Sequence, residues 1–198
     1  MEAHQAEDDV AQEADPRTWR SYVRPVLRWA EHFLAVMGVI FIVYFLCFNL
    51  SYMASPSMAP TLQADETSRD WVLTQKTSLW LLNPSRWEII TFRDKEGIQL
   101  MKRVVGLPGE TISLPDVGKL HIDGKLMDLP ERLSFLQYLP SGNLMNGKSA
   151  AAGEGWYVLG DYVRDSLDSR YEGPVPRSRI VGRAWLRVWP LSRFGFVR

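Results

Sequence analysis

The chain has 198 residues, of which 23 are basic and 23 acidic, and it contains 3 histidines and 1 cysteine. One cysteine can form neither an internal disulfide nor a cysteine-rich metal site, and it leaves the redox compartment open. His4 and His32 precede the longest apolar run, which argues against a three-histidine metal site, and a Ser-His-Asp triad would have to use His121. The zero net charge argues against a nucleic-acid partner.

The first 32 residues form a polar segment ahead of the apolar run. Residues 2–15 are rich in Asp and Glu, which is typical of a solvated, disordered tail. Four arginines follow them: Arg17, Arg20, Arg24 and Arg28. We therefore assign residues 1–32 to an N-terminal tail.

The apolar run predicts a transmembrane helix over residues 33–53. No Asp, Glu, Lys or Arg occurs from His32 to Ala64, and the run approaches the ~20 residues that a helix needs to cross a bilayer. A core helix would need a polar side for water, and a cleaved signal peptide has a shorter apolar run of about 7–15 residues. Because the four arginines precede the run, the positive-inside rule places the N-terminus in the cytoplasm and residues 54–198 outside.

Residues 54–198 are enough for one domain with its own core. Short runs rich in Val, Ile, Trp and Thr, separated by turn residues, predict strands at 71–76, 87–92, 98–105, 156–159 and 180–189. Residues 120–127 predict a hairpin that turns at Asp123-Gly124. Residues 128–155 are loop-like, within a small insertion over about 115–155. The expected fold class is mainly β, with one transmembrane helix followed by an all-β domain.

The first motif that suggests chemistry follows the apolar run directly. It reads Ser-Pro-Ser-Met-Ala-Pro-Thr-Leu over residues 55–62. By itself this stretch is typical of a proline-stiffened linker that leaves a helix.

The second motif is a lysine in an apolar strand. Side chains alternate between the two faces of a strand, so Lys102 shares a face with Ile98, Leu100 and Val104. One interpretation is an edge lysine that reaches water. The other is a desolvated lysine, whose pKa falls because burial disfavours the charged form, so that it can act as a general base.

The third motif is a loop dense in hydroxyls and charges, Gly-Asp-Tyr-Val-Arg-Asp-Ser-Leu-Asp-Ser-Arg over residues 160–170. It fits either a solvated loop with surface ion pairs, each worth at most ~1 kcal/mol, or a loop that supports a buried amine.

Together, these three motifs resemble the bacterial type I signal peptidases, a family of membrane-anchored Ser-Lys proteases. Residues 57–62 are similar to the nucleophile box S-M-x-P-T-L, residues 70–76 to the strand after it, and residues 102–110 to the general-base box. Residues 160–170 resemble the family's G-D-N-R-x-x-S-x-D-S-R box, except that Tyr162-Val163 replaces Asn-Arg. The resemblance covers about residues 33–194.

The resemblance implies a role for each matching residue. Ser57 would be the nucleophile and Lys102 the general base, with no metal and no cofactor. The oxyanion hole would consist of the Ser57 backbone N–H and the Ser55 hydroxyl. The resemblance also implies a support group, in which Ser166 hydrogen-bonds the Lys102 amine and Asp168 pairs with Arg170, with Arg103 as a further partner.

The resemblance also implies the substrates and the location of the protein. Signal peptides of preproteins would be cleaved after an Ala-x-Ala-like site at the outer face of the bacterial cytoplasmic membrane. Met58, Leu62 and Leu100 are expected to line the first substrate pocket, and an extended substrate would add beside a sheet edge. Four tryptophans are candidates for contact with the lipid bilayer: Trp80, Trp87, Trp185 and Trp189.

Three alternatives remain open from the sequence. The Tyr162-Val163 departure is compatible with a membrane-tethered homologue that binds peptides without cleaving them. The mitochondrial inner-membrane peptidases also depart from the pattern near that position. A self-cleaving Ser-Lys regulator is disfavoured by the membrane helix and by the absence of a DNA-binding helix pair.

Overall fold

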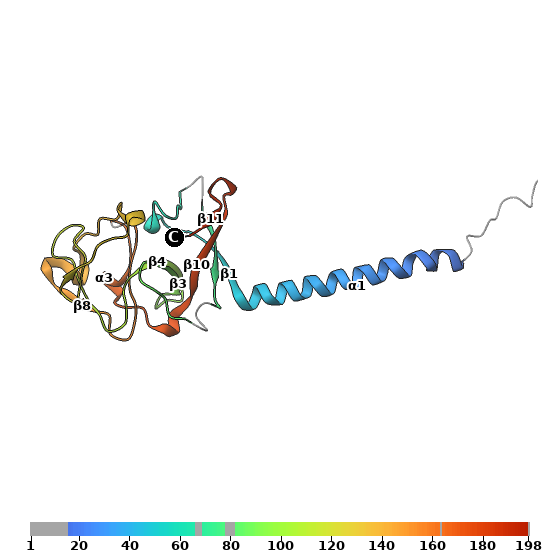
Figure 1. Ribbon diagram of the computed structural model, residues 1–198, viewed down its shortest axis with the longest axis horizontal. Coiled ribbons are helices and arrows are strands. Elements are labelled where there is room, and N and C mark those ends of the chain that lie inside the picture. Colours follow the sequence, from blue (N-terminus) through green and yellow to red (C-terminus); the bar gives the residue numbers. More distant parts are fainter. Residues whose placement is uncertain (1–15, 66–68, 78–81, 163, 198) are drawn as a thin grey trace, which may run out of the picture. The chain divides into compact units, whose positions relative to one another are not determined.

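A computed structural model describes residues 16–65, 69–77, 82–162 and 164–197 (Figure 1). The chain divides into two compact units, Met1–Tyr44 and Phe45–Arg198. Trp80 and Val163 lie outside the described residues.

The first unit is described from the start of helix α1, which runs over Pro16–Cys47. Within the described residues, its segment Val23–Cys47 is the one helix that is long and apolar enough to cross a membrane, and none of its most apolar stretch is buried. The helix begins well before residue 33, so the second half of the predicted N-terminal tail is helical.

The predicted end of the helix at residue 53 is wrong, because Phe48–Tyr52 forms strand β1. All five residues of β1 pair with β2, from Phe48 opposite Gln75 to Tyr52 opposite Trp71. The ladder satisfies the backbone groups that a continuing helix would otherwise pair. Strand β1 reads Phe-Asn-Leu-Ser-Tyr, an alternation of apolar and polar residues that is typical of a strand, but the absence of charged residues as far as Ala64 obscures it.

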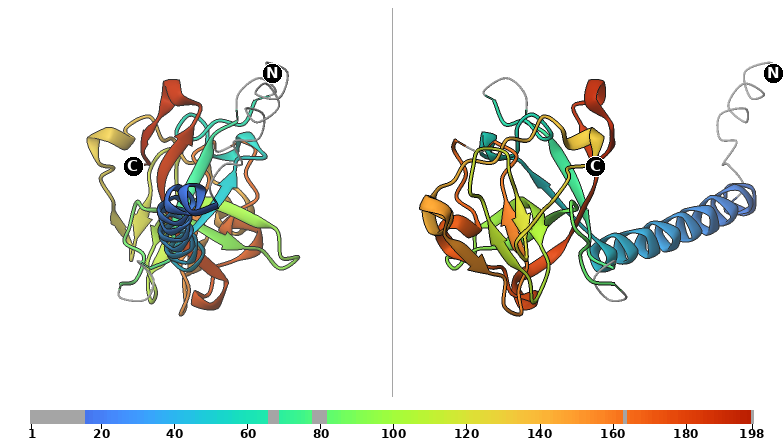
Figure 2. Two further views of the ribbon diagram at one scale, coloured as in Figure 1. Left: turned by 90° about the vertical axis from the view of Figure 1, so that its right-hand side faces the viewer. Right: turned by 60° about the vertical axis from the view of Figure 1, so that its left-hand side comes forward.

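The second unit is built around a large antiparallel sheet, in the order β1-β2-β10-β3-β4-β9, with β11 added to β10 (Figure 1). Five of its strands lie within two residues of the predicted ranges. The longest, β10, crosses the domain in both views of Figure 2. The strand bounds are β2 Trp71–Gln75, β3 Ile89–Arg93, β4 Gln99–Gly106, β9 Tyr157–Leu159, β10 Ile180–Trp189 and β11 Gly195–Phe196.

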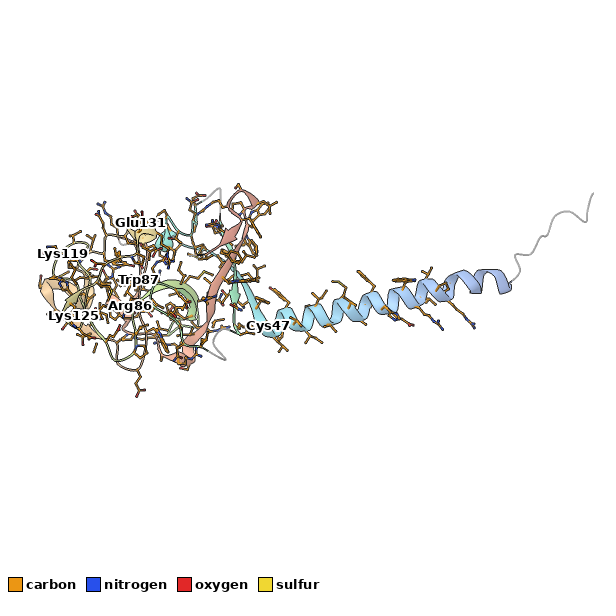
Figure 3. All side chains as sticks on the ribbon, in the orientation of Figure 1. Cys47, Arg86, Trp87, Lys119, Lys125 and Glu131 are labelled. Carbon is orange, nitrogen blue, oxygen red and sulfur yellow. The ribbon has the colours of Figure 1, made fainter. Side chains whose placement is uncertain are left out.

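A smaller sheet, in the order β7-β6-β5-β8, covers the region predicted as an insertion. The predicted hairpin is confirmed, because Asp123 and Gly124 both adopt positive φ, as a type I′ turn requires. In Figure 3 the labelled Lys119 and Lys125 lie at the end of the domain opposite to Cys47. The strands are β5 Thr111–Ser113, β6 His121–Ile122, β7 Lys125–Leu126 and β8 Ser149–Ala151.

Short helical turns connect the strands, and they carry Ser57 and Arg170. Three of them concern the site: η1 Pro56–Met58, α3 Ser169–Glu172 and η5 Leu191–Arg193. Three more lie in connections, namely η2 Glu131–Leu133, η3 Gly142–Gly147 and η4 Arg177–Arg179.

Strand β4 has two neighbours over different parts of its length. Residues Gln99–Arg103 pair with β3, and pairing with β9 begins only at Arg103. Among the described strands, none pairs with the second edge of β4 before Arg103. The sheet therefore leaves an open edge beside Lys102, where an extended peptide has backbone groups to bind.

Candidate active site

The loop after β1 carries Ser57 on the short turn η1. Pro56 occupies the first helical position, where its missing N–H is not needed, and Ser55 before it is extended. The Ala59 N–H donates to the Pro56 carbonyl at 2.8 Å and the Leu62 N–H to the Met58 carbonyl at 2.9 Å. These two bonds make residues 55–62 a compact turn rather than a loose linker, and Ser57 is 4% exposed.

Lys102 meets Ser57 across 45 residues of sequence. Its Nζ lies 2.5 Å from Ser57 Oγ, and the lysine is only 2% exposed. Burial lowers the pKa of Lys102 to about 8, although Asp168 and Asp161 partly oppose this by favouring the ammonium. The lysine is therefore buried rather than at a solvated edge, and a substantial fraction is neutral near pH 8.

Ser55 completes a row of three polar groups. Its hydroxyl donates to Ser57 Oγ at 3.1 Å, so Ser57 Oγ is contacted by both Ser55 and Lys102. The oxyanion-hole roles given to the Ser55 hydroxyl and the Ser57 N–H stay predictions.

The neighbour of Lys102 ties the strand to the nucleophile turn. Arg103 donates from Nε to Asp161 Oδ1 at 2.8 Å and from Nη2 to Asp161 Oδ2 at 2.6 Å, with both side chains fully buried. The Thr61 hydroxyl donates to Asp161 Oδ2 at 2.5 Å, and Arg103 Nη1 donates to the Trp87 carbonyl. This bidentate pair fixes Thr61 relative to β4.

A second buried ion pair organises the loop before α3. Asp168 accepts from Arg170 Nε at 2.8 Å and from Nη2 at 2.7 Å, and it caps α3 by accepting from the Arg170 N–H. The Ser166 hydroxyl also donates to Asp168, at 2.7 Å. The predicted pairing of Asp168 with Arg170 is therefore present in the structure.

Two details of the predicted support group differ from the geometry. The Ser166 hydroxyl bonds Asp168, and no bond to Lys102 occurs among the described contacts of either residue. Arg103 does not join the Asp168–Arg170 pair, because its guanidinium is occupied by Asp161. The support group is thus two separate ion pairs.

Ser166 still lies beside the nucleophile, with Gly160 between them. A Cβ on Gly160 would clash with the Ser166 hydroxyl and would stand 2.6 Å from the Ser57 carbonyl oxygen. The Gly160 N–H also donates to Asp168 at 3.1 Å. Only glycine leaves room for the loop to approach this closely.

Comparison with known proteins identifies the family of this chain. The sequence profile of the family described as "Signal peptidase, peptidase S26" matches residues 26–189. This chain belongs to the signal peptidase family.

Individual relatives give the extent of the similarity. A probable signal peptidase I-2 of Synechocystis is 32% identical over 153 residues, which cover 74% of this chain and 65% of that protein, just under two thirds of its length. Signal peptidase I of Bacillus caldolyticus is 32% identical, covering 85% of this chain and 93% of its own. A mitochondrial ATP-independent inner membrane protease subunit 1b of Arabidopsis thaliana is 34% identical, covering 74% and 73%.

The departure from the signal peptidase pattern at residue 162 leaves a backbone contact in place. The Tyr162 N–H donates to the Ser57 carbonyl at 3.0 Å, while the tyrosine side chain is 42% exposed. Because the bond uses the main chain, any residue except proline can make it. The substitution at residue 162 is therefore compatible with an ordered nucleophile turn.

The residues expected to line a substrate pocket separate into two groups. Met58 and Leu62 are fully buried and belong to one cluster, which also contains Met101. Leu100 packs partly buried against a different cluster, around Ile90. Met58 and Leu62 have no exposed surface, so the structure does not present them to a substrate as lining residues.

The tryptophans expected at a bilayer surface also divide. Trp87 is 9% exposed and lies in the middle of the domain in Figure 3. Trp185 stacks on Phe48 at 5.7 Å between ring centroids, and Trp189 is exposed. Trp87 is therefore a core residue.

Among the described residues, no three His, Cys, Asp or Glu side chains are grouped so that they could hold a metal ion. The polar groups that meet at the site are a hydroxyl and an amine.

Proposed function

We propose that this protein is a membrane-bound serine endopeptidase that removes signal peptides from exported preproteins. The observation that carries the proposal is the 2.5 Å contact between Ser57 Oγ and the buried Nζ of Lys102. A serine hydroxyl is a weak nucleophile until an adjacent base takes its proton, and a lysine with a pKa of about 8 is a competent base at mildly alkaline pH.

Acylation follows from this contact. Neutral Lys102 accepts the proton of the Ser57 hydroxyl as Oγ attacks the scissile carbonyl carbon. The resulting oxyanion is stabilised by the Ser57 N–H and the Ser55 hydroxyl, and one such donor is typically worth about 10²–10³ in rate. Lys102 then gives the proton to the leaving amine, the peptide bond breaks, and the signal peptide stays esterified to Ser57.

Deacylation uses the same two groups with water as the nucleophile. Lys102 takes a proton from a water molecule as the water oxygen attacks the ester carbonyl. The Ser57–acyl bond breaks, and the proton returns from Lys102 to Ser57 Oγ. The cycle leaves the enzyme unchanged and needs no cofactor.

Substrate binding is supported by the edge of β4 that no described strand pairs before Arg103. An extended peptide can pair with β4 over Gln99–Lys102, with its scissile carbonyl at Ser57. Met58 and Leu62 are fully buried, so the preference for small residues before the cleavage site is carried over from the family.

The proposed location combines the apolar helix with its flanking charges. Val23–Cys47 spans the bacterial cytoplasmic membrane, with the arginines near its start on the cytoplasmic side. The domain after Phe45 then lies at the outer face, where Trp185 and Trp189 are available for contact with the lipid bilayer.

The test is cleavage of an Ala-x-Ala reporter preprotein by the full chain and by single variants. Ser57→Ala and Lys102→Ala should each abolish turnover while thermal melting shows a folded domain. Lys102→Arg should also be inactive, because arginine keeps its proton at any accessible pH. Full activity in Ser57→Ala or Lys102→Ala would overturn the mechanism.

The same measurement separates the alternatives. A non-catalytic homologue would bind the reporter peptide and leave it intact in the wild type. A self-cleaving regulator would shorten only itself. The mitochondrial alternative, which the similarity to an inner membrane protease subunit favours, is tested by the location of the tagged protein in its source organism: a mitochondrial inner membrane instead of a bacterial cytoplasmic membrane would support it.

A further inference from the structure

Asp70 joins the two ends of the turn that carries Ser57. Its side chain is fully buried, and its Oδ2 accepts from the Gln63 N–H at 2.8 Å. Its carbonyl accepts from the Met53 N–H at 2.9 Å, and its own N–H donates to the Gln63 carbonyl at 3.0 Å. One residue therefore holds the chain on both sides of Ser57.

Two arginines of the C-terminal hairpin pair with this carboxylate. Arg193, on the turn η5, lies 2.9 Å from Asp70 Oδ2, and Arg187, on β10, lies 3.6 Å from the same atom. Arg187 Nε also donates to the Arg193 carbonyl, which links the two arms of the hairpin. We call Asp70, Arg187 and Arg193 the hairpin clamp.

The same guanidinium groups contact the nucleophile turn directly. Arg187 Nη1 donates to the Thr61 carbonyl at 3.0 Å, and Arg193 Nη2 donates to it at 3.3 Å. Arg193 Nη2 also lies 3.4 Å from the Pro60 carbonyl oxygen. Each arginine thus uses several N–H groups at once, on a carboxylate and on backbone carbonyls.

Thr61 is consequently held from two opposite directions. Its hydroxyl is bound by Asp161, which pairs with Arg103 beside Lys102. Its carbonyl is bound by Arg187 and Arg193. The position of the Ser57 turn relative to the strand that carries Lys102 therefore depends on both sets of contacts.

We propose that Arg187 and Arg193 of the C-terminal hairpin, together with Asp70, are positioning residues for the peptidase reaction, holding the Ser57 turn at the distance from Lys102 that proton transfer requires. This inference rests on the proposed function, because it assigns the clamp to that reaction. Among the described hydrogen bonds and ion pairs, none joins these three residues to Ser57 or Lys102, so they act through the backbone of Pro60, Thr61 and Gln63. A displacement of about 1 Å in such a turn can cost roughly 10²-fold in rate.

Arginine is needed here for its shape as well as its charge. The guanidinium presents five N–H donors in a fixed fork, whereas the lysine ammonium is a point charge with three. Arg187→Lys and Arg193→Lys keep the charge beside Asp70, and they cannot bind the carboxylate and the Thr61 carbonyl in the same geometry.

The experiment compares these two variants with Arg183→Lys in the full chain. Arg183 lies on the same strand β10 and pairs with Glu88 at 2.8 Å, and among the described contacts it makes no bond to residues 53–63. Measurements are kcat and KM on the reporter preprotein, the pH profile and the melting temperature. We expect kcat to fall roughly 10- to 100-fold in both clamp variants, with KM and the midpoint of the pH profile little changed.

Two further variants test whether Asp70 and the two arginines act as one unit. Asp70→Asn should reproduce the loss of kcat, and the Arg187→Lys/Arg193→Lys double variant should cost little more than either single one, because residues that act as a unit are not additive. The inference is overturned if the clamp variants match Arg183→Lys in kcat, or if the loss appears in KM alone.

Ser57→Ala is assayed in parallel to separate the two proposals. If Ser57→Ala still cleaves, the proposed function fails whatever the clamp variants do. If Ser57→Ala is inactive and the clamp variants behave like Arg183→Lys, only the clamp is wrong.

Discussion

Among single side chains, Lys102 is the group whose surroundings matter most. Lys102 is buried on β4, next to the buried Arg103. Burial lowers the pKa of Lys102 by more than the nearby carboxylates raise it. Because burial disfavours the ammonium, Lys102 loses its proton at a pH where an exposed lysine would keep it, and the neutral amine is available as a base.

The first prediction concerns pH. Because neutral Lys102 is the active form and its pKa is lowered to about 8, kcat/KM should rise about tenfold per pH unit below pH 8 and level off above it. A pH profile of preprotein cleavage by the full chain checks this. A profile that falls as pH rises from 6 to 9 would contradict a lysine base.

The second prediction concerns Gly160. In Gly160→Ala the new methyl meets the Ser57 carbonyl oxygen and the Ser166 hydroxyl, so the nucleophile turn must shift. We expect kcat to fall by roughly 10²-fold. Gly38→Ala is the matched control, because nothing lies within 4 Å of a Cβ at that position. Equal activity in the two variants would show that the contact at Gly160 relaxes without consequence.

At the level of elements, the loop before α3 depends on one carboxylate. Asp168 serves Ser166, Gly160 and Arg170 at once, in a buried site. A substitution of Asp168 therefore disturbs all three of these contacts together.

The third prediction follows from this burial. Asp168→Asn removes the carboxylate charge that faces the buried Arg170 guanidinium and should lower the free energy of unfolding by about 3–5 kcal/mol. The surface pair Lys119–Asp116 gives the control: Asp116→Asn should change it by less than about 1 kcal/mol. Denaturant unfolding of both variants measures the difference, and equal effects would mean that the Asp168 site relaxes or admits water.

The strands that the sequence predicted and those that it missed differ in a physical way. Strands β2, β3, β4 and β10 alternate or concentrate β-branched and aromatic residues, so their pattern marks them. Strand β1 follows the helix without a turn residue or a charge between them, so its short apolar–polar alternation, Phe-Asn-Leu-Ser-Tyr, is predicted as the end of the helix although it pairs with β2. Strand β8 has three small or polar residues, Ser149–Ala151, which carry no hydrophobic period.

The site likewise contains residues that the sequence predicted and contacts that it could not predict. Ser57 and Lys102 stand in motifs that can be recognised in the sequence, and the structure brings them into contact. The partner of Arg103 could not be read from spacing, because Asp161 and Asp168 are both acidic residues of the same loop. Which carboxylate an arginine reaches is decided by the path of the loop, and the sequence does not specify that path.

For the whole molecule, the division into two units has a functional consequence. The boundary falls between Tyr44 and Phe45, and Lys76 binds the carbonyls of Phe45 and Cys47 on the domain side. Strand β1 thus belongs to the domain and must remain with it.

The fourth prediction is that a fragment beginning at Phe45 folds and cleaves a water-soluble reporter peptide about as fast as the full chain. The same fragment should cleave a preprotein embedded in vesicles more slowly, because the anchor no longer supplies a high effective concentration at the membrane. Both rates are measured side by side. Loss of peptide cleavage in a folded fragment would show that the helix contributes to the site itself.

Because strand β1 follows helix α1 directly, the segment that connects the helix to Ser57 is short. Only ten residues lead from Cys47, the last residue of α1, to Ser57, and five of them are tied into β1. Even fully stretched, such a tether spans at most ~35 Å. With the helix in the bilayer, Ser57 therefore stays within about that distance of the lipid surface. Under the proposed function, a scissile bond of the right sequence that a folded domain holds farther out is out of reach, so its height above the membrane is a criterion of selection alongside side-chain size.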